Sequence, residues 1–109
     1  MSKILIVDDD FHLRQSFEKL LAEEGHEVFA ASTGEAGIAM TRDQVLDLVI
    51  MDMRLPGMDG LKAFKVIREV EPKLPVIVMT AFGTTETAIE ATKLGAFDYV
   101  LKPFEIPEM

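Results

Sequence analysis

The stretch ILIVDDDF, residues 4–11, runs four apolar residues directly into three aspartates. Apolar residues without polar alternation are typical of a strand that is buried on both faces of a sheet. Carboxylates repel one another, so three in a row at the end of such a strand need a compensating interaction. The stretch therefore predicts a buried strand whose carboxyl end contributes residues to a functional site.

Apolar runs alternate with segments of helical periodicity along the whole chain. Strands are predicted at residues 3–7, 26–31, 47–51, 75–79 and 97–101. Helices are predicted at residues 11–24, from 32 to about 42, across 61–67, and at 85–94. Ser32 and Glu35 have the spacing of a capping box, and Gly25 is placed to end the first helix. Strict alternation of strand and helix predicts a doubly wound α/β fold with a parallel sheet.

The composition excludes several classes of protein. A chain of 109 residues forms one domain with a real core, and 49% hydrophobic residues argue against disorder. The absence of cysteine excludes disulfides and thiolate metal sites, and a net charge of −8 argues against direct binding of nucleic acid. No apolar run reaches about 18 residues and the N-terminus lacks the long apolar stretch of a signal peptide, so no membrane span is expected. The absence of cysteine makes the reducing cytoplasm the expected location.

Polar residues follow most of the predicted strands, at the edge where ligands bind in doubly wound sheets. They are Asp8, Asp9, Asp10, Asp52, Thr80 and Lys102. Carboxylates that converge there repel by about 4 kcal/mol per pair at 4 Å, which a hard cation such as Mg²⁺ would relieve. Thr80 could donate a hydrogen bond to a phosphoryl group and Lys102 could supply positive charge. The set fits phosphoryl transfer to a carboxylate.

Each of these residues also has a plainer role. Asp10 directly precedes a helix, so an N-cap is favoured over a metal ligand. Taken singly, Asp52 is an ordinary strand-end residue, Thr80 a cap or core-edge hydroxyl, and Lys102 a solvated lysine before Pro103. The joint placement at one edge is what favours a chemical role.

Four motifs carry a resemblance to a known family: ILIVDDD, VIMDMRLPGMDG, VIVMTAFG and GAFDYVLKPF. In order and spacing they resemble the receiver domain of bacterial two-component response regulators, over essentially the whole chain. The resemblance implies a flavodoxin-like, five-stranded parallel sheet of order 2-1-3-4-5. It implies that Asp52 accepts a phosphoryl group from the phosphohistidine of a sensor histidine kinase. Such a domain is a signalling phosphoacceptor rather than an enzyme.

The resemblance also implies a role for the other site residues. The implied Mg²⁺ ligands are Asp8, Asp9, Asp52 and the backbone carbonyl of Arg54, with Asp9 and Asp52 binding directly. Thr80 and Lys102 would contact the phosphoryl oxygens. Thr80 and Tyr99 would form a switch pair that changes the surface of the fourth helix and fifth strand, where a partner or a second copy of the chain binds. The bond before Pro103 is expected to be cis.

Two departures from the family are expected. The chain ends at EIPEM, where the family's fifth helix should start, so residues 1–109 are interpreted as a receiver domain that lacks most or all of that helix. No output domain is present. DMRLPGMDG and GAFDYVLKPF look most like receivers of regulators that activate σ54 promoters through an ATPase domain and a DNA-binding domain, so a transcriptional output is expected.

Two other classes stay open. ILIVDDDF also fits the start of haloacid-dehalogenase-type phosphatases, with Asp8 as nucleophile and Asp10 as acid. Three features count against this class. Phe11 replaces a small or β-branched residue, the second acidic pair is missing, and Asp52 would have no role. The third class is a degenerate receiver that serves only as a protein-binding module, and the complete set of site residues argues against it.

Overall fold

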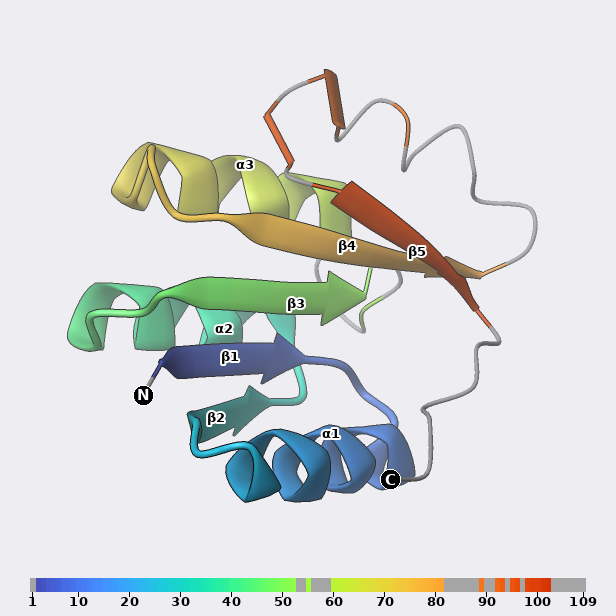
Figure 1. The fold of residues 1–109 in the computed structure, drawn as a ribbon. Coiled ribbons are helices and arrows are strands. Elements are labelled where there is room, and N and C mark those ends of the chain that lie inside the picture. The colour runs from blue at the N-terminus through green and yellow to red at the C-terminus, as the bar shows by residue number, and fades with distance from the viewer. Residues whose placement is uncertain are drawn as a thin grey trace.

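The computed structural model describes residues 2–52, 55, 60–81, 89, 92–93, 95–96 and 98–102. Strands and helices alternate along the chain (Figure 1), in the order β1 (Lys3–Val7), α1 (Phe11–Glu23), β2 (Glu27–Ala31), α2 (Gly34–Asp43), β3 (Leu48–Asp52), α3 (Gly60–Val70), β4 (Val76–Ala81) and β5 (Asp98–Lys102). The alternation predicted from the sequence is confirmed from β1 to β4. Most of the predicted helix at residues 85–94 lies outside the described residues.

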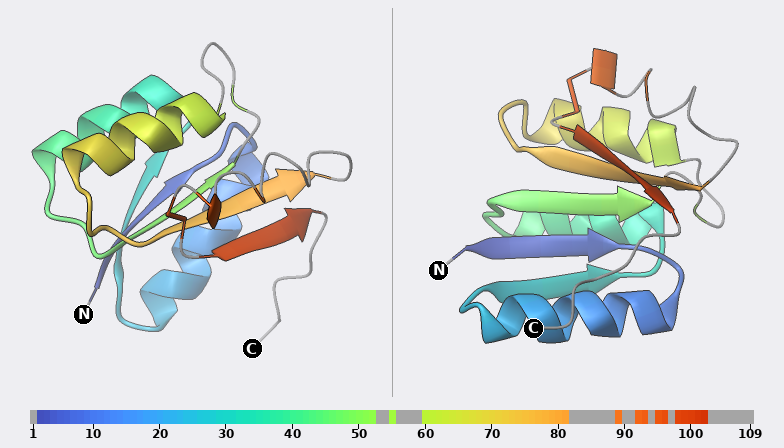
Figure 2. Two further views of the ribbon diagram at one scale, coloured as in Figure 1. Left: turned by 90° about the horizontal axis from the view of Figure 1, so that it is seen from above. Right: turned by 45° about the vertical axis from the view of Figure 1, so that its right-hand side comes forward.

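The strands form one parallel sheet in the order β2-β1-β3-β4-β5. The order reverses after β2, and right-handed crossovers then place α1 on one face of the sheet and α2 and α3 on the other, as Figure 2 shows. This is the flavodoxin-like α/β fold that the resemblance implied. In the described part of the chain, no helix is long and apolar enough to cross a membrane.

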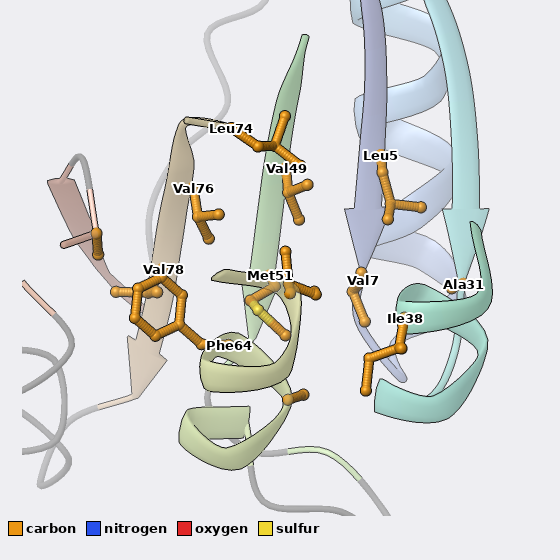
Figure 3. Close-up of a cluster of buried hydrophobic side chains, with 13 residues drawn as sticks. Leu5, Val7, Ala31, Ile38, Val49, Met51, Phe64, Leu74, Val76 and Val78 are labelled. Atoms are coloured by element: carbon orange, nitrogen blue, oxygen red, sulfur yellow. The ribbon is translucent and has the colours of Figure 1, made fainter. Parts of the chain in front are cut away.

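Hydrophobic residues fill both faces of the sheet because successive side chains of a strand point to opposite sides. Leu5 and Val7 of β1 join Phe64 of α3 in the larger cluster, whose members are drawn in Figure 3. Ile4 and Ile6 point to the other face and pack in a second cluster with α1. All four apolar residues of β1 are buried, which explains why the strand shows no polar alternation.

Both ends of α1 are closed by local hydrogen bonds. Asp10 is the N-cap, as predicted, and its Oδ1 accepts from the backbone N–H groups of His12 and Leu13 at 2.9 and 3.2 Å. At the other end, Gly25 adopts φ +90°. The N–H of Gly25 donates to the carbonyl of Ala22 at 3.0 Å, and the N–H of His26 to that of Leu21 at 3.1 Å. This Schellman motif confirms the predicted stop at Gly25.

The predicted start of α2 is wrong by one residue. Thr33, not Ser32, is the N-cap, because Thr33 is extended (φ −136°) and its Oγ1 accepts from the N–H of Ala36 at 3.1 Å. Glu35 is therefore the second helical residue, where a capping box needs an acid at the third. Two residues further on, a Cβ added at Gly37 would lie 2.9 Å from Val7 Cγ2, so glycine lets α2 approach β1 closely.

Arg68 ties α3 to the segment that leads into β5. Its guanidinium donates to the carbonyl of Pro72 at 2.7 Å and to those of Leu74 and Gly95 at 2.9 Å. The same guanidinium carbon lies 5.3 Å from the centre of the Phe64 ring. These contacts fix the start of β5 relative to the core.

Candidate metal centre

The register of the two central strands brings two carboxylates together. Val7, the last residue of β1, lies opposite Met51 of β3. The next residues in parallel register are Asp8 and Asp52, so both acids meet at the carboxyl edge of the sheet. With Asp9 they form a cluster in which one carboxylate oxygen from each residue lies within 4.8 Å of the others.

Burial makes this cluster electrostatically costly. Asp8 is 0% exposed and Asp52 is 5% exposed, whereas Asp9 is exposed to solvent. At 4.8 Å each carboxylate pair repels by roughly 3 kcal/mol at an effective dielectric of 20. An all-oxygen donor set of this kind suits a hard divalent cation such as Mg²⁺. The residues present therefore fit the metal predicted from the sequence.

Asp8 is held by hydrogen bonds to its side chain and to both ends of its backbone. Its N–H donates to the carbonyl of Ala31 at 3.0 Å, which extends the pairing of β1 with β2 by one residue. Its Oδ1 accepts from the N–H of Asp10 at 2.8 Å, and its carbonyl accepts from Arg14 Nη1 at 2.7 Å. The turn that carries the first two acids is thus fixed at several points. The contribution of Arg14 was not predicted, because its spacing in the sequence is that of an ordinary solvated helix residue.

The polar residues of the other strands require one correction. Asp52 and Lys102 do not follow β3 and β5 but are their last residues, and Thr80 lies within β4. Asp52 pairs with Met79, Thr80 with Leu101 and Ala81 with Lys102. Backbone hydrogen bonding between strands does not depend on whether a side chain is polar, so the strand pairing continues through these positions. Because the strands are parallel and adjacent, the backbones of Thr80 and Lys102 still lie at the same edge as Asp52.

Four further predicted residues remain. Asp10 uses its carboxylate to cap α1, as the plainer interpretation held. Tyr99 lies in β5 opposite Val78, and the structure describes its backbone. Arg54 and Pro103 lie outside the described residues.

The fold and the site define a flavodoxin-like domain with an acidic cluster, whose donor atoms suit a cation, at the carboxyl edge of its sheet. Residues 4–109 match the family model of the response regulator receiver domain, and the chain belongs to this family. It is a receiver domain of two-component response regulators, as the sequence motifs indicated.

Similar proteins cover the chain almost completely. The chain is 44% identical over 109 residues to Regulatory protein AtoC of Escherichia coli K12. This match covers 100% of the chain and 24% of AtoC. It is 36% identical over 107 residues to Sporulation initiation phosphotransferase F of Bacillus subtilis 168, covering 98% of the chain and 86% of that protein. The crystal structure of a response regulator receiver domain protein from Clostridium thermocellum shares 34% identity with a TM-score of 0.91, over 96% of this chain and 85% of that chain. The chain thus spans about a quarter of the length of AtoC.

Proposed function

We propose that Asp52 accepts a phosphoryl group from the phosphohistidine of a sensor histidine kinase, in a reaction that needs Mg²⁺. The observation that carries this proposal is the cluster of Asp8, Asp9 and Asp52 within 4.8 Å, at the point where the strand order reverses. The cation would be held by these three carboxylates together with the backbone carbonyl of Arg54. When bound, it would neutralise the carboxylates and the transferring phosphoryl oxygens.

In the proposed transfer, a carboxylate oxygen of Asp52 forms a bond to phosphorus while the bond between phosphorus and the kinase imidazole nitrogen breaks. The electron pair of that bond returns to the imidazole, and Asp52 becomes an acyl phosphate. Thr80 would donate its hydroxyl proton in a hydrogen bond to a phosphoryl oxygen, and the Lys102 ammonium would balance the added charge. Their positions at the same sheet edge as Asp52 support these roles.

The acyl phosphate carries up to about two negative charges in place of the single charge of the Asp52 carboxylate. We propose that it draws Thr80 and Lys102 toward Asp52 and that Tyr99 follows as the second member of the switch pair. The surface of β5 and of the segment before it would then change and bind an output domain or a second copy of the chain. In this reading residues 1–109 are the receiver part of a longer, cytoplasmic regulator that continues into a fifth helix. Its output would be transcriptional, through a σ54-activating ATPase domain and a DNA-binding domain.

The phosphatase alternative is disfavoured by the position of Asp10. That class needs Asp10 as a free acid next to a nucleophilic Asp8, but the Asp10 carboxylate caps α1. Asp52 would have no role in such a phosphatase, yet it is buried in the acidic cluster. A degenerate receiver that serves only as a binding module is disfavoured, because Asp8, Asp9 and Asp52 are all present and lie close together.

The proposal is tested with Mg²⁺ and the small phosphodonor acetyl phosphate, followed by intact-mass and peptide mass spectrometry. One labile phosphoryl group should appear on Asp52. Asp52→Asn should abolish it and Asp8→Asn should only weaken it, whereas Asp43→Asn is a control because Asp43 is an exposed acid at the end of α2. A label on Asp8 would instead support the phosphatase class, and no label on any acid would support the binding module.

A further inference from the structure

Arg14 of α1 folds back onto the turn that carries the acidic residues. Its Nη1 donates to the backbone carbonyl of Asp8 at 2.7 Å. Its guanidinium carbon lies 5.6 Å from the centre of the Phe11 ring, a distance at which a cation and an aromatic face attract. The side chain is half-buried, so part of its charge is removed from water. Arg14 is therefore held in one arrangement by a carbonyl and a ring.

The bond to Asp8 fixes the direction of the peptide group between the first two acids. The Asp8 carbonyl and the Asp9 N–H are two ends of one planar unit, so an anchor on the oxygen sets the plane for both. The N–H of Asp8 and its carboxylate are already bonded to Ala31 and Asp10. The Arg14 bond thus restrains the remaining backbone group of Asp8, the one that leads directly to Asp9.

The position of Arg14 conflicts with helix electrostatics. It is the fourth residue of α1. A cation near a helix N-terminus opposes the helix dipole at a cost of about 0.3–1 kcal/mol. A residue that breaks a local rule in this way is often retained for the site it supports. Here the offsetting contacts are the Asp8 carbonyl and the Phe11 ring.

We propose that Arg14 is a positioning residue for the divalent cation. It holds the Asp8–Asp9 peptide so that both carboxylates present oxygens to one ion. This inference rests on the cation site of the proposed function. Removal of Arg14 has two opposing effects on the affinity for the cation. Loss of the positive charge raises the affinity, whereas loss of the hydrogen bond to the Asp8 carbonyl frees the turn and lowers it. Mutation of groups that orient metal ligands typically lowers metal affinity by about 10–100-fold. Loss of the hydrogen bond from Arg14 therefore outweighs loss of its partly screened charge.

The test is the Kd of the chain for Mg²⁺ alone, measured by titration of backbone amide shifts. Arg14→Ala should raise the Kd by about tenfold, at the lower end of that range because the charge effect opposes it. Arg14→Lys shortens the reach to the carbonyl and keeps the charge that repels a cation, so its Kd should also rise above that of wild type. Lys19→Ala is the matched control, since it removes an exposed positive charge from the same helix. Its Kd should stay within about twofold of wild type, as expected for an exposed charge.

Further measurements separate positioning from general stability. Amide exchange at Asp9 and Asp10 should be faster in cation-free Arg14→Ala than in wild type, because the turn is released. Phe11→Ala leaves the hydrogen bond but removes the ring, and should weaken Mg²⁺ binding by about two- to threefold, a smaller loss than for the anchor itself. Phe11 is 56% exposed, so Phe11→Ala should fold even if Arg14→Ala is unfolded.

The possible outcomes distinguish the two proposals. Equal or tighter Mg²⁺ binding by Arg14→Ala, with wild type binding normally, would overturn the role of Arg14 and leave the cation site intact. If Arg14→Ala is unfolded, an unchanged Kd for Phe11→Ala would overturn that role. A wild-type chain that does not bind Mg²⁺ would overturn both this inference and the proposed cation site.

Discussion

Neutralising Asp9 should make the cation-free domain more stable. Asp9 shares the cluster with Asp8 and Asp52, so Asp9→Asn removes two repulsive pairs that lie within 4.8 Å. The value of roughly 3 kcal/mol per pair at a dielectric of 20 is an upper bound, because Asp9 is exposed and water screens its charge. With that discount we expect the free energy of unfolding to rise by about 1–2 kcal/mol in the absence of divalent cations.

Mg²⁺ should remove most of this difference in stability. A cation at about ten times its Kd stabilises the folded state by about 1.4 kcal/mol through binding linkage. Wild type should show this gain, and Asp9→Asn should lose most of it because a charged ligand is gone. The assay is urea unfolding with EDTA and with a Mg²⁺ series, each at low and high NaCl. High salt should shrink the stability difference in EDTA, since salt screens the repulsion.

Asp10→Asn is the matched control for this experiment. It neutralises the neighbouring acid, but asparagine caps a helix about as well as aspartate. It should therefore change both the cation-free stability and the Mg²⁺ response only slightly. The reasoning is refuted if Asp9→Asn is less stable than wild type in EDTA, or if it keeps the full gain with Mg²⁺.

Two further predictions concern the packing of α2 and the signalling surface. Gly37→Ala should lower the urea midpoint, because its Cβ would meet the stiff, buried Val7 at 2.9 Å. Overpacking costs about 1–3 kcal/mol and the helix propensity of alanine returns up to about 1 kcal/mol. The double variant Gly37→Ala/Val7→Ala should show a favourable coupling energy, and strict additivity would contradict the contact. Beryllofluoride, a phosphoryl mimic, should shift amides of residues 82–102 as well as those beside Asp52 in a Mg²⁺-dependent way. Shifts confined to residues 53–60 would argue against the proposed switch.

Much of the fold follows from periodicity, but the ends of the elements do not. β1 is buried on both faces and begins and ends as predicted, because its apolar run stops abruptly at Asp8. β3 and β4 extend past their apolar runs, since Asp52 and Thr80 continue the backbone pairing with polar side chains. Likewise, Ser32 and Thr33 are both good caps, and only the backbone conformation decides that Thr33 is used. Local sequence does not specify these choices.

The candidate site divides in a similar way. The acids could be found because several polar residues fall at strand ends, but their proximity depends on β1 lying beside β3. That neighbour relation came from the family resemblance and is confirmed by the sheet order. Arg14 could not be assigned, because its bond to Asp8 depends on the angle at which α1 leaves the sheet. The conflict of its charge with the helix dipole was the one signal available in the sequence.

The rigidity of the sheet links stability to function at this site. β1 and β3 are packed from both faces, so Asp8 and Asp52 cannot move apart to relieve their repulsion without disturbing the core. Asp8 is also tied to Ala31, Asp10 and Arg14, which leaves exposed Asp9 as the acid with freedom to adjust. A flexible cluster would lower its own energy by spreading and would then bind a cation weakly. In this domain the repulsion is retained in the folded state, and the free energy released when a cation neutralises it contributes directly to binding.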